Sequence, residues 1–356
     1  MKPMHSLYQV EQLPTFQNRV YDAEFEAKTC PKGDIRLVED LRTGLVYNEA
    51  FRPELMNYDS GYNNEQAVSP FFRQHLRAVS QIIARHVGRQ RIVEIGCGKG
   101  YFLEMLVADG FDITGFDPTY EGTNPMVRKE YFRPEKEGRR EGFVLRHVLE
   151  HIQNPLEFLF TLREANEGAG KVYIEVPCFD WICRHRAWFD IFYEHVNYFR
   201  IGDFNRIFGT LELAERSFGD QYLSIIADLR TLRRPQFDPA NRVQFPGDFT
   251  RGLRLHPSEQ SVIWGSGSKG VIFALLMERA GGKFEHVVDI NPAKHGKYLA
   301  GTGLKISSPS EALKRLEDGA TIYVMNGNYL AEIKEMSENR FQYVTIDEQS
   351  LPGPAT

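Results

Sequence analysis

The stretch RIVEIGCGKGYFLEML, residues 91–106, decides the fold of this protein. An apolar run leads into three glycines, Gly96, Gly98 and Gly100, and a helical pattern follows them directly. Glycine permits the left-handed backbone of a tight turn and lets a ligand approach the chain closely. A buried strand, a glycine turn and a helix in this order are typical of parallel α/β sheets that bind a nucleotide at the carboxyl edge of the sheet.

The alternation of strand and helix continues beyond this stretch and starts again in the C-terminal third of the chain. An amphipathic helix also precedes it, with apolar residues at three-to-four spacing from Phe72 to His86. The expected elements of the first series span residues 91–96, 100–110, 112–117, 142–152, 155–167 and 171–177, and those of the second span 261–265, 270–282, 284–290 and 320–326. Strands separated by helices predict an α/β fold with two parallel sheets.

The length of 356 residues exceeds what one hydrophobic core usually supports. We predict an irregular N-terminal lid region over residues 1–70, a nucleotide-binding domain over 71–235, and a linker with a second, smaller Rossmann-like domain over 236–356. Turn signals such as CPKGD and RTG suggest the irregular region, and residues 231–259, rich in Pro, Arg and Asp, suggest a connecting segment.

Composition excludes several kinds of partner. The chain has 43 Lys and Arg against 48 Asp and Glu, a net charge of -5, so it offers no field for general attraction to nucleic acid. No apolar run approaches the length of a membrane span, and the start shows no signal-peptide pattern. We therefore predict a cytoplasmic protein with a small-molecule substrate, without nucleic-acid or membrane partners, either a monomer or a homodimer. Four scattered cysteines without a CxxC pair predict no disulfide framework and no metal.

Two carboxylates flank the first glycine turn. Glu94 stands two residues before Gly96, and Asp117 ends the next expected strand, where an acid can accept the hydroxyls of a ribose. The spacing ExGxGxG differs from the GxGxxG that pyrophosphate prefers, which favours S-adenosylmethionine, a ligand without phosphate. The alternative is that Glu94 caps the turn and Asp117 is a solvated strand end, but an unpartnered carboxylate at a buried strand end is costly.

With these residues the sequence resembles the class I S-adenosylmethionine-dependent methyltransferases. The resemblance lies in VEIGCGKG (93–100), in GFDP (115–118) and in FVLRHVLEHIQNPLEFL (143–159). It implies a Rossmann-like methyltransferase domain with S-adenosyl-L-methionine as cofactor. The residues it implies for cofactor binding are Glu94, Gly96, Cys97, Gly98, Gly100, Asp117, Pro118 and His147. His147 is equally well explained as a satisfied strand-end histidine.

The segment EVPCFDWICRHRAWFDIFYEHVNYFR, residues 175–200, gathers acids, histidines and tyrosines. A Glu–His pair can hold and remove a proton. The segment narrows the resemblance to the C-methyltransferases of nucleotide-linked keto-deoxysugars, which carry a similar P…EHxxYF stretch, a histidine in the VLEH position and a second Rossmann-like domain. The resemblance implies proton abstraction beside a ketone and methylation of the enolate, with His195 and Glu194 as the base and His151 facing the reacting centre.

Two departures from that family open an alternative. The family's N-terminal domain usually binds zinc through paired cysteines, but this N-terminal region has only Cys30. A tyrosine commonly stands where this chain has Phe192, so we predict that Tyr193, Tyr58 or Tyr62 substitutes, the last two as acceptor contacts. The alternative is an O- or N-methyltransferase acting on a non-sugar metabolite of secondary metabolism. A third hypothesis is a non-catalytic module that retains the cofactor fold.

The second glycine turn, GSGSKG from Gly265 to Gly270, is a full GxGxxG, and Asp289 ends the next expected strand. Taken alone, this is a better dinucleotide fingerprint than the first turn, so a dehydrogenase is the rival interpretation. The family resemblance instead implies a domain that helps bind the substrate or stays empty. In that case we expect Lys269 to contact a nucleotide phosphate near the start of the helix.

Overall fold

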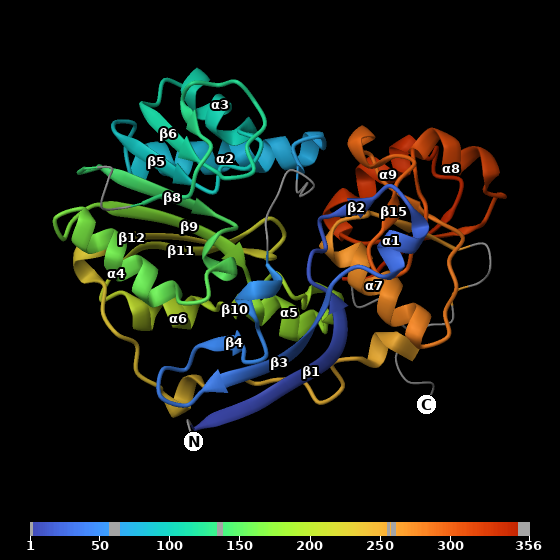
Figure 1. Ribbon diagram of the computed structural model, residues 1–356, viewed down its shortest axis with the longest axis horizontal. Helices are drawn as coiled ribbons and strands as arrows, with labels where there is room; N and C mark the ends of the chain where they lie inside the picture. The colour runs from blue at the N-terminus through green and yellow to red at the C-terminus, as the bar shows by residue number, and fades with distance from the viewer. Residues whose placement is uncertain (1–2, 57–64, 134–137, 255–256, 258–260, 348–356) are drawn as a thin grey trace.

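The computed structural model describes residues 3–56, 65–133, 138–254, 257 and 261–347. Over these residues the chain forms sheets of seven, five and four strands and a two-stranded pair. Figure 1 shows the seven-stranded sheet with its helices on one side of the molecule and the orange and red C-terminal unit on the other. The blue N-terminal strands β1 (Met4–Pro14) and β3 (Lys32–Asp40) run below the seven-stranded sheet, toward the C-terminal unit.

The seven-stranded sheet has the order β11-β12-β9-β8-β5-β6-β7. Its strands are β5 (Ile92–Ile95), β6 (Ile113–Phe116), β7 (Val127–Arg128), β8 (Gly142–Arg146), β9 (Lys171–Pro177), β11 (Leu211–Ser217) and β12 (Tyr222–Asp228). The strands from β9 to β7 pair in parallel, whereas β11 and β12 are antiparallel. The predicted alternation of strand and helix is confirmed.

Helices cover both faces of this sheet. They are α2 (Pro70–His86), α3 (Tyr101–Ala108), α4 (Pro155–Ala165) and α6 (Ile201–Ile207), and the short α5 (Phe179–His185) follows β9. Ile92 and Val144 share one apolar cluster with α2 and α3, whereas their chain neighbours Val93 and Leu145 share the other with α4 and α6. This alternation arises because successive strand residues point to opposite faces of a sheet.

Helix α2 begins where its sequence predicts. Ser69 precedes it, and the Ser69 hydroxyl accepts a hydrogen bond from the backbone N–H of Phe72 at 3.3 Å. Pro70 occupies the first turn, where its missing N–H costs nothing. The helix buries Phe72, Leu76, Val79, Ser80 and Ile83. This three-to-four spacing turns one stripe of the helix toward the sheet.

The C-terminal unit holds a five-stranded parallel sheet in the order β16-β14-β13-β17-β18. Its elements are β13 (Val262–Trp264), α7 (Ser268–Arg279), β14 (Val287–Val288), β16 (Ile306–Ser307), α8 (Pro309–Arg315), β17 (Thr321–Val324), α9 (Leu330–Met336) and β18 (Gln342–Thr345). The second glycine turn joins β13 to α7, so the second predicted α/β series is also present.

The N-terminal region, predicted to be irregular, contains long paired strands. β1 pairs with β3, and β3 pairs with β4 (Val46–Asn48), which pairs in turn with β10 (Asn197–Tyr198). The turn signals mark only the connections: RTG joins β3 to β4, and CPKGD runs into β3. Side chains far along the chain cover these strands, for example Phe249 against Tyr8 with ring centroids 5.1 Å apart. This is why local sequence gave little strand signal.

The predicted domain boundaries stay predictions, because two small pairings cross them. β4 pairs with β10, and β2 (Val20–Tyr21) pairs with β15 (Tyr298–Leu299), next to the helix α1 (Glu24–Lys28). The N-terminal segment therefore joins both larger units (Figure 1). None of the described helices combines the length and the apolar character needed to cross a membrane.

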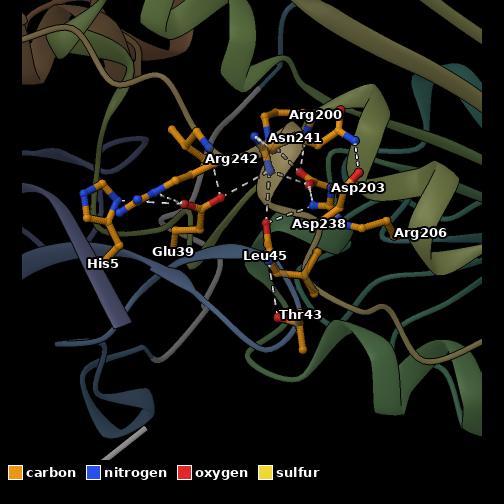
Figure 2. A network of polar contacts seen from close by, with 12 residues as sticks. His5, Glu39, Thr43, Leu45, Arg200, Asp203, Arg206, Asp238, Asn241 and Arg242 are labelled. Carbon is orange, nitrogen blue, oxygen red and sulfur yellow. Dashed lines mark hydrogen bonds and ion pairs between the residues drawn. The ribbon is translucent and has the colours of Figure 1, made fainter. Parts of the chain in front are cut away.

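A buried polar network fixes the N-terminal strands on the side away from the glycine turns. Figure 2 shows Glu39 of β3 among three basic side chains: its oxygens lie 3.8 Å from His5, 3.8 Å from Arg200 and 3.9 Å from Arg242. Glu39 Oε1 also accepts the backbone N–H of Val243 at 3.0 Å. None of these residues lines the two cavities described below, although Arg200, Arg242 and Val243 line a third cavity of about 610 Å³.

Candidate active site

The first glycine turn has the left-handed backbone that its sequence predicts. The φ angles are 73° at Gly96, 57° at Gly98 and 85° at Gly100. A Cβ added at Gly96 would lie 2.5 Å from a methyl group of Val148, whereas at Gly98 it would meet no atom within 4 Å. Only glycine fits these positions without strain, and the open space at Gly98 leaves room for a ligand against the backbone.

The two predicted carboxylates lie together at this turn. Asp117 Oδ2 accepts the backbone N–H of Gly98 at 2.8 Å, and Oδ1 accepts the N–H and hydroxyl of Thr119 at 2.8 and 2.7 Å. Glu94 is buried, and its Oε2 has no hydrogen-bond partner among the described residues. Burial raises the pKa of Glu94 to about 7, with Arg146 opposing the rise and Asp117 adding to it. Asp117 thus shapes the turn, while Glu94 has an oxygen to spare.

A large cavity of about 650 Å³ opens at the carboxyl ends of β5, β6 and β8. It is lined by the turn from Glu94 to Lys99, by Asp117 to Thr119 and by Arg146 to Val148. All residues predicted to bind the cofactor line it except Gly100, which begins α3 behind the turn. The Cys97 side chain is buried, and its sulfur would lie 2.8 Å from a Cβ at Gly115, so Cys97 packs against β6.

The residues of this cavity suit S-adenosylmethionine. The unpartnered Glu94 oxygen is an acceptor for an ammonium group, and two acids at one turn favour a cation. Apolar side chains, including Phe72, Phe116 and Phe132, line the remaining wall and fit an adenine ring and a methyl-bearing chain.

His147 follows β8 between two carboxylates. Its Nδ1 lies 3.4 Å from Glu150 Oε1, and its Nε2 lies 3.2 Å from Glu175 Oε1. The backbone has a φ of 52°, uncommon for a residue other than glycine, and its N–H donates to the carbonyl of Glu175 at 2.8 Å. Burial alone would lower the pKa of His147, but Glu150 and Glu175 raise it to about 9, so the imidazole is positively charged at neutral pH.

Glu175 of β9 anchors this cluster from within the sheet. It is fully buried and accepts hydrogen bonds from Arg146 at 2.9 and 3.1 Å and from the Tyr173 hydroxyl at 2.9 Å. His75 Nε2 lies 2.9 Å from Oε2, the oxygen that also accepts from Tyr173. Burial by itself would raise the pKa of Glu175, but Arg146, His147 and His75 hold it well below its ordinary value.

His195 lies nearby in the opposite protonation state. Its ring packs edge-on to His151 at 4.8 Å between centroids and tilted against Phe192 at 3.9 Å. Burial lowers the pKa of His195 well below its ordinary value, and the charges of His151 and His147 lower it further. His195 is therefore a neutral imidazole, which is the form that accepts a proton.

The structure separates the adjacent residues Glu194 and His195. Glu194 Oε1 accepts the backbone N–H groups of Gln17 and Asn18 at 2.5 and 3.1 Å. The carboxylate facing His195 is Glu150, whose Oε1 lies 4.0 Å from His195 Nε2. The expected pairing of Glu194 with His195 is thus not made by their side chains, because the turn at Tyr193 and Glu194 directs the carboxylate to the backbone N–H groups of Gln17 and Asn18.

Tyr193 does not supply the missing hydroxyl beside His195. Its hydroxyl accepts the backbone N–H of Arg52 at 2.8 Å, and its ring packs behind Phe51, which lines the large cavity, whereas Tyr193 itself lines neither cavity. The Tyr198 hydroxyl is likewise bonded to the backbone of Phe192 at 3.2 Å. Tyr58 and Tyr62, the predicted acceptor contacts, lie outside the described residues.

A small cavity of about 230 Å³ connects the histidines with the second glycine turn. Its walls include His147, His151, Phe192 and His195 on one side and Gly265 to Gly270 with Lys269 and Lys294 on the other. His147 and His151 also line the large cavity, so they stand where the two cavities meet. An acceptor in the small cavity would reach the large one between these two histidines.

The second glycine turn is built around Asp289. Its Oδ2 accepts the backbone N–H of Ser266 at 2.9 Å and the Ser266 hydroxyl, and Oδ1 accepts the N–H of Asn291 at 2.8 Å. Lys294 lies 3.7 Å from this carboxylate. The predicted phosphate contact, Lys269, donates to Gln221 at 2.8 Å and lies 3.4 Å from Asp190. Both lysines line the small cavity with their charges partly compensated.

Glu150, His151 and His195 present metal-ligand atoms that all lie within 4.8 Å of one another, among the residues described. The charged His147 already contacts Glu150 at 3.4 Å and opposes a cation at this carboxylate. The prediction of no metal therefore stays a prediction, which elemental analysis of the purified protein tests.

Sequence reasoning missed four residues of this site: His75, Glu150, Glu175 as an anchor, and Tyr222. The Tyr222 ring lies 4.6 Å from that of His147 and lines the small cavity. Glu150 stands between two histidines in HVLEH. The 3-10 turn Leu149–His151 brings it beside His147, so this spacing was a sequence signal for the contact. His75 gave none, because it belongs to a helix that only the tertiary fold brings to β9.

Comparison with known proteins finds a matching family for one part of the chain. Residues 66–214 match the family model described as a methyltransferase domain, which leaves the N-terminal strands and the C-terminal unit unmatched. No curated protein sequence matches the chain.

Two solved structures illustrate the structural likeness. The 1,6-didemethyltoxoflavin-N1-methyltransferase of Burkholderia thailandensis is 17% identical over 43% of this chain and 77% of its own, with a TM-score of 0.34. The magnesium protoporphyrin IX methyltransferase of Synechocystis PCC 6803 is 13% identical over 44% of this chain and 82% of its own, with a TM-score of 0.35. Likeness at this level carries no argument about the acceptor.

Proposed function

We propose that this protein, whose residues 66–214 are an S-adenosylmethionine-dependent methyltransferase domain, methylates a carbon of a nucleotide-linked keto-deoxysugar. The observation that carries the proposal is the neutral, buried His195 in the wall of the small cavity, next to the two histidines that connect this cavity to the large one. Such an imidazole is suited to removing a proton of low acidity from an acceptor sheltered from water.

On the cofactor side, Glu94 and Asp117 with the glycine turn hold S-adenosylmethionine. Bound there, the cofactor supplies a methyl group activated by a positively charged sulfur. Gly98 keeps the backbone open for close approach, and the spare oxygen of Glu94 accepts from the ammonium group. The acidic wall favours the cationic cofactor over its neutralised product, which helps release after transfer.

On the acceptor side, His195 takes the proton from the carbon beside the ketone. The positively charged His147, held between Glu150 and Glu175, lies next to the path and stabilises negative charge that develops on the acceptor. Both its ring nitrogens face carboxylates, so His147 acts through its charge. His151 is fixed by a hydrogen bond between its Nδ1 and the carbonyl of Glu194 at 2.8 Å and shapes the passage between the cavities.

The nucleotide part of the acceptor is assigned to the second glycine turn. Lys269 and Lys294 provide positive charge at the far end of the small cavity, and the start of α7 adds backbone N–H groups. Supporting this role, both lysines lie on the same cavity as His195. A nucleotide-linked sugar would thus place its sugar toward the histidines and its phosphates toward the lysines.

The alternative is O- or N-methylation of a non-sugar metabolite. This alternative is favoured because the hydroxyls of Tyr193 and Tyr198 are hydrogen-bonded to the backbone. Neither tyrosine of the segment 175–200 is therefore available to assist an enolate. Transfer to oxygen or nitrogen needs only orientation and one base, for which His195 suffices.

The test is a transfer assay with methyl-labelled S-adenosylmethionine and a panel of nucleotide-linked keto-deoxysugars, with NMR location of the label. Label on a ring carbon supports the proposal, label on oxygen or nitrogen supports the alternative, and no transfer to any sugar contradicts the proposed acceptor. His195→Ala should lower turnover by roughly a hundredfold or more. The affinity of the His195→Ala variant for the cofactor, measured by calorimetry, should equal that of the wild-type protein, because His195 does not line the large cavity.

A further inference from the structure

Glu150 occupies an unusual position between two imidazole rings. It is fully buried, and neither carboxylate oxygen has a partner with hydrogen-bond geometry among the described residues. Its Oε1 lies 3.4 Å from His147 Nδ1 and 4.0 Å from His195 Nε2. Keeping a carboxylate buried without hydrogen bonds is costly, so this placement indicates a role beyond packing.

The carboxylate on the far side of His147 is held in place. His147 Nε2 faces Glu175, which is itself fixed by two hydrogen bonds from Arg146 and one from Tyr173. The charged His147 therefore holds the Glu150 carboxylate from one side. The other side of the same oxygen is directed toward His195.

The geometry of His195 selects one of its two neutral forms. An imidazole whose Nε2 faces a carboxylate carries its proton there and leaves Nδ1 with a free electron pair. His195 Nδ1 is buried and has no hydrogen-bond partner among the described residues, and the residue lines the small cavity. The separation of 4.0 Å is longer than a hydrogen bond; such contacts commonly shorten when the acceptor binds.

We propose that Glu150 is the positioning residue for His195: its carboxylate selects the Nε2–H form and stabilises the imidazolium formed when Nδ1 takes a proton from the acceptor. In this step the C–H bond beside the carbonyl breaks, its electron pair forms the enolate, and the proton bonds to Nδ1. The proton leaves to solvent after the product departs. The chemistry of the acceptor rests on the proposed function. The tautomer of the His195 ring does not depend on it.

The first test therefore needs no acceptor. Histidine labelled with ¹⁵N reports by NMR which ring nitrogen carries the proton, and the His195 signals are assigned by their loss in His195→Ala. In the wild-type protein at neutral pH we expect Nε2 protonated and Nδ1 bare, and in Glu150→Gln a shift toward a mixture of both forms. Protonation at Nδ1 in the wild-type protein, or unchanged His195 signals in Glu150→Gln, would overturn the proposal.

Glu39→Gln is the matched control. Glu39 is also a fully buried glutamate with an oxygen that lacks a hydrogen-bond partner among the described residues, and it too lies among basic groups (Figure 2). Unlike Glu150's neighbour His195, it lines neither of the two cavities. Glu39→Gln should leave the His195 signals unchanged even if it lowers stability. If both variants moved these signals equally, a general loosening of the fold would be the cause and the proposal would fail.

The second test uses an acceptor once one is identified. Exchange of its acidic proton with deuterated water, measured by NMR without cofactor, should slow roughly a hundredfold in Glu150→Gln, with kcat falling similarly and KM nearly constant. Glu150→Asp keeps the charge and should recover part of the rate. A change in KM alone would overturn the proposal. Failure of every sugar in the panel, with the expected NMR result, would defeat the proposed acceptor and leave the role of Glu150 standing.

Elemental analysis of the purified protein tests the competing use of the same side chains. We expect no divalent metal in stoichiometric amount. One equivalent of metal in the wild-type protein, lost in Glu150→Gln, would overturn the proposal, because a metal on the His195 nitrogen that faces Glu150 would replace the Nε2 proton and leave the ring proton on Nδ1.

Discussion

The two glycine turns of this protein share one construction and differ in charge. In the first, Asp117 Oδ2 accepts the backbone N–H of Gly98 at 2.8 Å, and in the second, Asp289 Oδ2 accepts that of Ser266 at 2.9 Å. In both turns the other oxygen accepts a backbone N–H two residues farther along the chain, at 2.8 Å. Each aspartate thus fixes the loop that precedes a helix.

The difference lies in the groups around each aspartate. Two residues before its first glycine, the first turn has Glu94 and the second has Ile263. Lys294 lies 3.7 Å from Asp289. Near Asp117, in contrast, lies Glu94, a buried acid with one oxygen that has no hydrogen-bond partner among the described residues. The first turn therefore carries two acids, whereas the second pairs its acid with a lysine. A glycine pattern of this type therefore indicates a nucleotide-like ligand, and the charged groups around the turn determine which kind of ligand fits.

The largest expected effect concerns Glu94, which has no counterpart in the second turn. Its pKa of about 7 lies above the ordinary 4.5, so between these values the folded protein binds more protons than the unfolded chain, and stability falls as pH rises. We expect cofactor-free Glu94→Gln to be more stable than wild type by about 3 kcal/mol at pH 8, with the gain absent at pH 4. Urea unfolding measures this.

The exposed Glu141, paired with Arg91 at 3.0 Å, provides the control for Glu94. Glu141→Gln should give no comparable gain at pH 8. Equal stability of Glu94→Gln and wild type across this pH range would mean that the two turns do not differ in buried charge. S-adenosylmethionine should bind more weakly to Glu94→Gln, because the variant keeps the shape and loses the charge.

A smaller effect is expected from exchanging the two aspartates for asparagine, one at a time. Asp117→Asn should raise the Kd for S-adenosylmethionine roughly 10- to 100-fold, the range of a charge-assisted hydrogen bond. Asp289→Asn should leave that Kd unchanged, because Asp289 lines only the small cavity. Calorimetry on both variants measures the contrast, and equal losses would break the assignment of the cofactor to the first turn.

The smallest effect is expected at the lysines of the second turn. Lys294→Met and Lys269→Met should each weaken the binding of thymidine diphosphate about tenfold, and added salt should reduce the difference. Lys99→Met is the control, because Lys99 lines only the large cavity and pairs with Glu121 at 2.7 Å. Tight NADH binding by the wild-type protein, seen as enhanced fluorescence, would favour the dehydrogenase interpretation of this turn.

Some of the fold followed from local patterns. The strand–turn–helix units around Gly96 and Gly265 and the amphipathic helix before them appear where the residues predict them. The strands of the N-terminal region escaped prediction although β1, β3 and β4 pair with one another, because the pairing is completed by β10, about 150 residues after β4. The apolar side chains that cover them are equally distant in sequence.

The candidate site was predictable in its residue types and not in its pairings. The sequence brought attention to His195 and His151, which the structure places in ring contact. It suggested Glu194 as their acid, yet that carboxylate holds Gln17 and Asn18, more than 170 residues away. Adjacency in the chain says little about adjacency of side chains, since the turn at Glu194 and its distant backbone partners decide where that carboxylate lies.

Two glycine turns after buried strands, each with an acid at the end of the next strand, could be derived from the sequence, because these features depend on backbone conformation and hydrophobic period over a few residues. The fold was needed to show that the two turns line cavities with shared wall residues and that Glu150 faces His195. Those relations depend on how packed layers orient side chains from distant segments, and burial then sets their charges: His147 is protonated and His195 is neutral within one cluster.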